Sequence, residues 1–203
     1  MTSIITGDII NSRKVPSEAW IEKLKALLHT FGENPTDWEI YRGDEFQLEV
    51  HNPEEALLVA IEIKALLKSL KMDVRMSIGI GDKKYTGKKI SESNGTAFIH
   101  SGESFETLKK QKTTLTVNSG TTDFDKEMNL MLRLALTIMD HWLQQSAEFV
   151  ITTIRNQSLS QEEIGMLLNI NQAAVSRRRS RANFDLIMEV DAFYAAKIKT
   201  LTV

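Results

Sequence analysis

Cysteine is absent from this chain of 203 residues, which excludes disulfides, zinc–thiolate centres and thiol chemistry. No apolar run approaches the ~18 residues of a membrane-spanning helix, so we expect no membrane partner. The first apolar run, residues 2–10, contains Asp8 and has no basic residue before it, which predicts a strand and not a signal peptide. We therefore expect a cytoplasmic protein. The four histidines show no metal-ligand spacing; they are His29, His51, His100 and His141.

Acidic and basic residues nearly balance, and the formal net charge is −2. Hydrophobic residues make up 42% of the chain and charged residues 26%, which is typical of a globular protein with a buried core. The arginines are unevenly placed, because residues 172–183 contain four of them and no acid. Such a concentration of arginine on one helix is the electrostatic footprint expected of phosphate contact.

Residues 159–182 predict two short helices joined by a tight turn. Ser160 and Glu163 have the spacing of a capping box, which starts a helix by satisfying its first backbone donors. Gly165 has no side chain and would let a second helix cross closely. Asn169 stands in the turn, where asparagine tolerates positive φ.

The second helix is expected to begin at Gln172. We expect Val175 to point inward, and Arg179 to lay its stem over the core or to meet an acid. Polar side chains of this helix are candidates for DNA contact, the arginines with phosphates or guanine edges and the others through hydrogen bonds. These candidate DNA-binding residues are Gln172, Ser176, Arg177, Arg178 and Arg181.

This stretch resembles the helix-turn-helix of many bacterial transcription regulators, whose pattern is roughly TQEEIA-LL-GISQ-TVSRR. The resemblance implies binding to double-stranded DNA. Because a single helix-turn-helix makes few contacts, useful affinity normally needs a homodimer on a two-fold site. The plainer alternative is a helical hairpin with a basic, solvated face.

Before this stretch, the chain predicts strand, helix, strand, strand, helix and strand, the ferredoxin-like (βαββαβ) arrangement of an α+β fold. A further helix at 95–110 and a strand at 113–117 follow. The polar stretch 119–122 is the best break in the chain, so we predict domains at 1–120 and 121–203. The first six elements are expected at 2–10, 16–31, 38–42, 46–50, 53–70 and 73–81.

The second domain is expected to be helical throughout. Residues 126–154 predict one long helix, apolar over much of its circumference, that packs between the two halves or in a dimer. Residues 184–201 predict a last helix after the helix-turn-helix.

The predicted topology brings two acids together. The first and third strands form the antiparallel central pair, so Asp8 at the end of the first lies near Asp44 in the hairpin that begins the third. Two neighbouring carboxylates repel unless a cation or a proton neutralises one of them. Their oxygens suit Mg²⁺ or Mn²⁺ bound to nucleotide phosphates, although either acid alone is equally typical of a turn. The candidate nucleotide-binding residues around them are Ile9, Asn11, Ser12 and Arg42.

These motifs resemble a known superfamily. The stretch TGDI at 6–9, with Asn11 and Ser12, looks like the first metal motif of class III nucleotide cyclases. RGDEF at 42–46 looks like their second motif and like the GGDEF box of diguanylate cyclases, and RMSIGIG at 75–81 looks like the cyclase RIGIHTG strand. The whole architecture resembles the bacterial SatD family, a resemblance that supplies no biochemical activity.

Two departures from the cyclase pattern argue against catalysis. Ile40 stands where class III cyclases have a purine-selecting lysine, and residues 95–104 lack the arginine that stabilises the transferring phosphoryl group. Our leading hypothesis is a DNA-binding transcription regulator whose degenerate cyclase-like domain senses a metal-nucleotide or mediates dimerisation. The alternatives are an Mg²⁺- or Mn²⁺-dependent nucleotide-processing enzyme, with the helix-turn-helix for docking or dimerisation, and a pure interaction protein.

Overall fold

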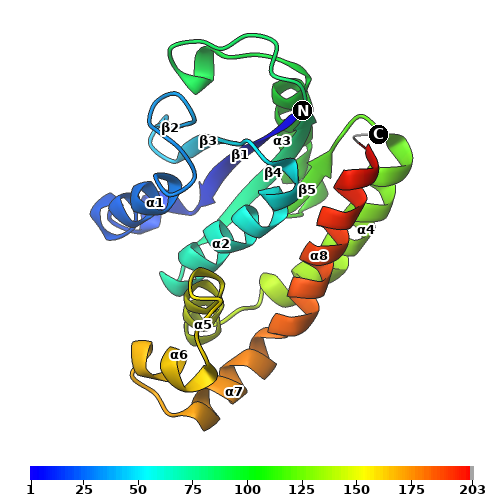
Figure 1. Ribbon diagram of the computed structural model, residues 1–203. Helices are drawn as coiled ribbons and strands as arrows, with labels where there is room; N and C mark the ends of the chain where they lie inside the picture. The colour runs from blue at the N-terminus through cyan, green and yellow to red at the C-terminus, as the bar shows by residue number, and fades with distance from the viewer. Residues whose placement is uncertain (202–203) are drawn as a thin grey trace.

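A computed structural model describes residues 1–201, the side chain of Lys109 excepted. The structure is α+β, and its single five-stranded mixed sheet has the order β2-β3-β1-β4-β5 (Figure 1). The strands are β1 Thr2–Ile10, β2 Trp38–Tyr41, β3 Glu45–Val50, β4 Asp73–Gly81 and β5 Leu115–Asn118.

β1 lies in the middle of the sheet. It pairs antiparallel with β3 and with β4, while β2 is antiparallel to β3 and β5 is parallel to β4. In this register Asp8 lies opposite Glu45 on one side and opposite Arg75 on the other. The sheet therefore brings an arginine of β4 to the acid of β1, a pairing that no spacing in the sequence indicates.

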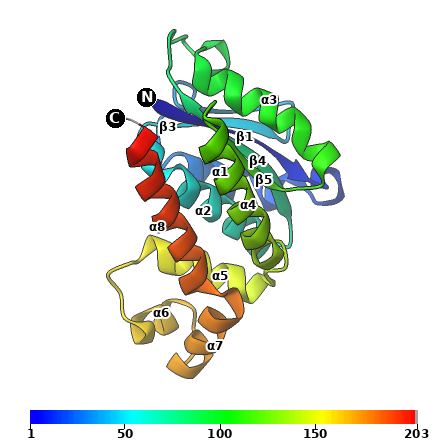
Figure 2. The same ribbon diagram turned by 90° about the vertical axis from the view of Figure 1, so that its right-hand side faces the viewer.

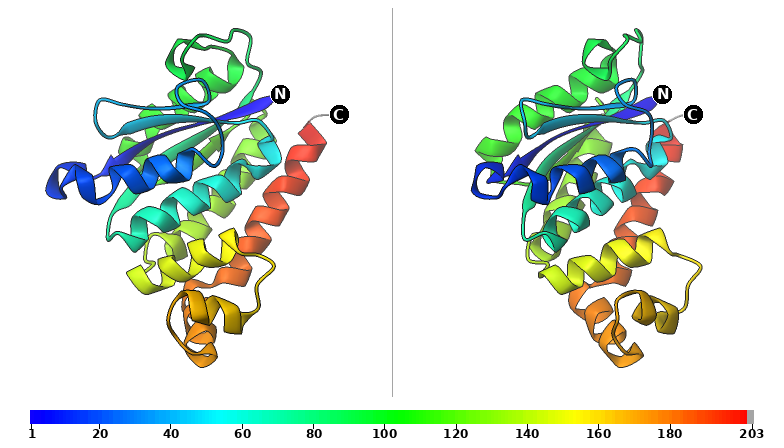
Figure 3. Two further views of the ribbon diagram at one scale, coloured as in Figure 1. Left: turned by 60° about the vertical axis from the view of Figure 1, so that its left-hand side comes forward. Right: turned by 90° about the vertical axis from the view of Figure 1, so that its left-hand side faces the viewer.

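Helices cover both faces of the sheet (Figures 2 and 3). The helices α1 Ile21–Leu28 and α2 Ala56–Ser69 lie on one face, and α3 Thr96–Gln111 lies on the other. α3 approaches β4 closely because a glycine lies beneath it, and a Cβ at Gly79 would come within 2.2 Å of the Ala97 carbonyl oxygen. Because both faces are covered, β1 is buried along nearly its whole length.

Short 3₁₀ turns accompany the helices. The helix predicted at 16–31 is shorter than expected, because Pro16 leads into a 3₁₀ turn and the α-helix begins only at Ile21. Proline fixes its own φ but does not by itself set the α-helical hydrogen bonds that follow. The turns are η1 Ser12–Lys14, η2 Ser17–Ala19, η3 Pro53–Glu55 and η4 Ile90–Glu92.

The last part of the chain is helical, as predicted. α4 packs on β5 and α8, α5 lies on α2, and α7 contacts α5, α6 and α8. Figure 1 shows α6 and α7 at the end of the molecule farthest from η4. The helices are α4 Thr122–Met139, α5 Gln144–Arg155, α6 Gln161–Leu167, α7 Gln172–Ala182 and α8 Phe184–Leu201.

The prediction of one continuous helix over 126–154 is wrong, because α4 and α5 are separate helices. Trp142 lies in the break between them, and its Nε1 donates a hydrogen bond to the Ala182 carbonyl oxygen at 2.9 Å. Lys68 of α2 donates to the carbonyl oxygen of Asp140 in the same break. Contacts from distant parts of the chain therefore override the helical propensity of these residues.

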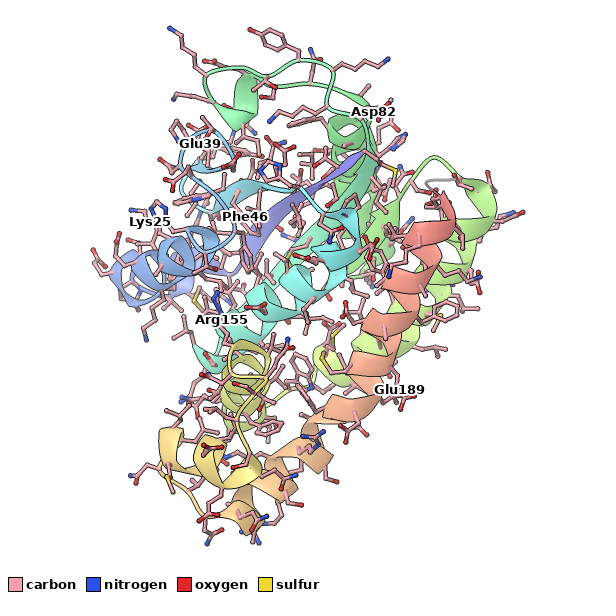
Figure 4. All side chains as sticks on the ribbon, in the orientation of Figure 1. Lys25, Glu39, Phe46, Asp82, Arg155 and Glu189 are labelled. Carbon is pink, nitrogen blue, oxygen red and sulfur yellow. The ribbon has the colours of Figure 1, made fainter. Side chains whose placement is uncertain are left out.

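The larger hydrophobic core runs across the boundary that we predict at residue 120. The Tyr194 hydroxyl of α8 donates to the Pro53 carbonyl oxygen at 3.0 Å. Arg155, labelled in Figure 4, reaches from α5 to Glu62 of α2 at 3.0 Å. The helical part is thus packed against the sheet part. No helix within residues 1–201 combines the length and the apolar character needed to cross a membrane.

Candidate nucleic-acid interface and candidate ligand site

The helical pair α6–α7 begins with the capping box expected from the sequence. The Ser160 hydroxyl accepts from the Glu163 backbone N–H at 3.3 Å, and the Glu163 carboxylate accepts from the Ser160 N–H at 2.7 Å. At the start of α7, the Asn171 side chain accepts from the Ala174 N–H at 2.9 Å. Both helix starts are therefore fixed by local side-chain hydrogen bonds.

The turn between the two helices is tight. Asn169 adopts φ 53°, the left-handed conformation that asparagine tolerates. The turn and the second helix pack closely against Gly165. A Cβ at this position would lie 2.7 Å from the Ile170 carbonyl oxygen and 3.4 Å from a Val175 methyl group. Val175 itself is fully buried. The close approach that we predict at Gly165 and the inward direction of Val175 are both confirmed.

Most of the predicted DNA-binding side chains lie on the outer surface of α7. Gln172, Ser176, Arg177 and Arg181 are exposed. Within residues 1–201, neither Arg177 nor Arg181 forms an ion pair. These two guanidinium groups are therefore available to a partner.

The prediction that Arg178 lies toward solvent is wrong. Its side chain is only 14% exposed and packs against α5. Its Nη1 lies 3.4 Å from the Glu148 carboxylate and 3.4 Å from the Gln145 carbonyl oxygen. The position of α5 decides this, because α5 lies against that side of α7.

Arg179 meets an acid, one of the two outcomes expected for it. Its guanidinium pairs with Asp185 of α8 and lies over the Phe184 ring at 5.1 Å. The hydrogen bonds from Arg179 lower the pKa of Asp185 below its ordinary value. Of the four arginines of α7, two are therefore used inside the protein and two point outward.

The second candidate site lies at the end of β1. Asp44 in the β2–β3 hairpin accepts a hydrogen bond from the Ser12 hydroxyl at 2.5 Å, and its backbone carbonyl accepts from the Ile9 N–H at 3.0 Å. The negative charges of Asp8 and Asp44 both interact with the guanidinium of Arg75. The sheet thus brings the two acids to one place, as the topology predicts.

The cation between these acids is an arginine. Arg75 donates from Nε to one oxygen of Asp8 at 2.8 Å and from Nη2 to the other at 2.5 Å. These hydrogen bonds raise the pKa of Arg75 above its ordinary value. Because the guanidinium engages both oxygens of Asp8 and Ser12 engages Asp44, this arrangement does not fit a divalent cation.

A pocket of about 270 Å³ opens beside Asp44. Arg42, with φ 52° in the hairpin, lies at its mouth, and its side chain is 80% exposed. The Trp20 indole Nε1 is buried with no hydrogen-bond partner in the described part of the chain. The polar and aromatic residues that line the pocket are Ser12, Arg13, Ser17, Trp20, Arg42 and Asp44.

The other two predicted nucleotide-binding residues are placed differently. Ile9 belongs to the core and is 2% exposed, and its backbone N–H is used by Asp44. Asn11, at φ 60°, lines a different groove on the far side of η1. The backbone N–H groups of the segment after Asp8 therefore do not all point toward the pocket, as binding of a phosphate by this segment would require.

A cluster of Asp37, Glu49 and His51 also gathers potential ligand atoms within 4.8 Å of one another. Glu49 is buried and already accepts from Lys83 at 2.5 Å and from Thr2 at 3.0 Å. Lys83 thus acts as the ion-pair partner of a buried acid. Internal ion pairing accounts for this cluster.

The SatD family model matches residues 2–191. No curated protein and no solved structure gives a significant match.

Proposed function

This chain belongs to the SatD family, and we propose that it is a DNA-binding transcription regulator. In this proposal α6 and α7 form a helix-turn-helix, and α7 enters the major groove of double-stranded DNA. Strands β1 to β4 with their helices form a ferredoxin-like, cyclase-related domain.

The observation that carries the proposal is the outer face of α7. This helix holds four arginines and no acid, and Arg177 and Arg181 point outward. Gln172 and Ser176 are also exposed and offer hydrogen bonds to bases or to the backbone. Arg178 is paired with Glu148 of α5, so the proposed contacts fall to the other four side chains.

We further propose a homodimer that reads a two-fold site, because one helix pair buries little surface on DNA. An apolar groove of about 240 Å³ between α4 and α8 supports a self-association surface. Leu134 and Leu186 beside it are 64% and 50% exposed. Sedimentation of the Leu134→Asp variant tests this surface; a parent that is monomeric at all concentrations refutes it.

The test of DNA binding is the salt dependence of affinity. Replacing Arg177 and Arg181 with alanine should weaken binding and reduce the slope of log K against log salt by about 0.9 for each lost phosphate contact. A matched control replaces Arg42 and Arg133, two exposed arginines outside α7, with alanine. An unchanged slope in the α7 variant, or an equal fall in the control, contradicts the proposed contacts.

A second candidate function is binding of a phosphorylated small molecule, such as a nucleotide, in the pocket beside Asp44. The polar lining of this pocket favours it. Arg42 and Ser12 at the pocket would face the phosphates. The engagement of Asp8 by Arg75 speaks against the Mg²⁺- or Mn²⁺-dependent enzyme that is the alternative to a regulator.

Calorimetric titration with nucleoside triphosphates and cyclic nucleotides, with and without Mg²⁺ or Mn²⁺, tests this second candidate. Metal-independent heat that an Arg42→Ala variant loses would support an anion pocket. Metal-dependent heat that an Asp8→Ala, Asp44→Ala variant loses would support binding of a metal-nucleotide by these two acids instead. No heat from any ligand refutes both.

A further inference from the structure

Two adjoining grooves lie where the β1–α1 connection and the α2–β4 turn meet the start of α5. Their volumes are about 460 and 340 Å³. Both are lined by Lys71 and Gln144, so they form one continuous depression. Lys14 lines the first groove and Lys23 the second. We call Lys14, Lys23 and Lys71 with the two grooves the basic groove.

The basic groove carries uncompensated positive charge. Lys14, Lys23 and Lys71 are exposed, and none of them forms an ion pair within the part of the chain that the structure describes. The one acid in the lining is Asp73, and its charge is already used by the ammonium groups of Lys64 and Lys68, at 2.8 and 2.9 Å. Three free ammonium groups therefore face a shared depression.

The start of α5 connects the basic groove to α7. Gln144 lines both grooves, and the carbonyl oxygen of the next residue, Gln145, lies 3.4 Å from Arg178 Nη1. Arg178 is already paired with Glu148 of α5, so the free positive charge of α7 is carried by Arg177 and Arg181, which are one helical turn apart. The basic groove and the outer arginines of α7 thus lie on either side of the start of α5.

Figure 3 shows the same succession. In its right-hand view the turns η1 and η2 (blue), the end of α2 (cyan), the start of α5 (yellow-green) and α7 (orange) follow one another down one side of the molecule. The loop that carries Lys84 and Lys88 lies at the opposite end, near the top of Figure 1. The three lysines of the basic groove all belong to the sheet part of the chain.

We propose that the basic groove binds the phosphate backbone of the duplex beside the stretch that α7 reads. This inference rests on the proposed DNA binding by α7 and extends it to the sheet domain. Duplex DNA presents one negative charge about every 1.7 Å along its axis, so a row of cations beside the reading helix meets successive phosphates. Contacts to phosphates fix register and affinity and carry no direct sequence information. The sheet domain is thereby a positioning element for the reading helix.

The experiment compares the full-length parent with the Lys14→Ala, Lys23→Ala, Lys71→Ala variant. Binding is measured by fluorescence anisotropy over a range of salt, on generic duplexes of about 30 and about 12 base pairs. On the long duplex the variant should lose about 0.9 of salt slope for each broken phosphate contact. On the short duplex, which α7 alone fills, the difference should shrink. Any preference for one sequence over another should be unchanged.

The matched control replaces Lys84, Lys88 and Lys126, three exposed lysines outside the basic groove, with alanine. Equal thermal midpoints of parent, variant and control exclude a folding defect. A parent that binds the long duplex while the basic-groove variant keeps the parental slope overturns this inference and leaves the role of α7 standing. An equal loss in the control also overturns it, since the effect is then net charge alone. A parent that binds neither duplex refutes the proposed function and this inference together.

Discussion

The buried carboxyl of Asp191 should make the stability of this protein depend on pH in an unusual direction. Asp191 lies on α8, and its Oδ1 is buried with no hydrogen-bond partner in the described residues. Burial raises the pKa of Asp191 from 3.8 to about 6, and a hydrogen bond from the backbone of Leu58, in the first turn of α2, offsets part of that rise. The charged carboxylate is therefore disfavoured in the folded state.

The magnitude follows from the two pKa values. At about 1.4 kcal/mol per pKa unit, a rise from 3.8 to about 6 corresponds to about 3 kcal/mol. Because the folded-state pKa is the higher one, the penalty is complete above pH 6 and disappears below the unfolded pKa, where the carboxyl is protonated in both states. The contribution of Asp191 to stability should thus improve as the pH falls from 8 to 4.

Replacing Asp191 with asparagine removes the charge and keeps the shape of the side chain. We expect the Asp191→Asn variant to have a free energy of unfolding higher than the parent by at most about 3 kcal/mol at pH 8, and by about half of that at pH 5. Urea denaturation at both pH values measures the difference. The parent-minus-variant difference isolates this group, because all other titrating groups are common to both proteins.

Asp185→Asn is the matched control, since it is the same substitution at an exposed position of the same helix. Hydrogen bonds from Arg179 lower the pKa of Asp185, so this variant should not be more stable than the parent at pH 8. If the effect of Asp191→Asn is the same at pH 5 and pH 8, the reasoning about Asp191 fails.

Two further predictions concern contacts between the sheet and the helices. Lys64 is fully buried, and its ammonium contacts Asp73 at 2.8 Å and Asp140 at 2.6 Å. Lys64→Ala should lower the free energy of unfolding by about 3 kcal/mol in urea denaturation at pH 7, because Asp140 loses this cation while Asp73 keeps Lys68. A loss below about 1 kcal/mol would contradict this role. On the outer edge of β5, the Asn129 side chain accepts a hydrogen bond from the Val117 N–H at 2.9 Å and donates one to the Val117 carbonyl oxygen at 2.7 Å. Asn129→Ala should lower the free energy of unfolding by about 2 kcal/mol and promote edge-to-edge association, which sedimentation measures. A stable variant that does not associate more than the parent would refute this prediction.

Several elements are recoverable from local pattern alone. β4 has the bounds that residue alternation predicts, 73–81, and α8 has the bounds that helical periodicity predicts, 184–201. The Ser160–Glu163 capping box is likewise visible in the sequence and present in the structure. In each case the signal lies in residues a few positions apart, which is the range over which backbone geometry and capping act.

The candidate sites could be predicted only in part. Strand order alone brings Asp8 close to Asp44, because adjacent strands place their ends together. No local pattern identifies Arg75 as the partner of Asp8, since the two are 67 residues apart and only the β1–β4 register makes them neighbours. The pattern of α7 alone places Arg178 in solvent, because its partner Glu148 lies on another helix.

The amino-acid sequence by itself determined the periodic elements, the α+β class, the helix starts and the concentration of arginine on α7. Only the tertiary structure decided that the helix over 126–154 breaks around Trp142, that Arg75 is the cation at Asp8, and that the basic groove lies beside the start of α5. The physical reason is range. Propensity and capping act within one or two turns, whereas these features depend on groups that are distant along the chain and meet only when the core is packed.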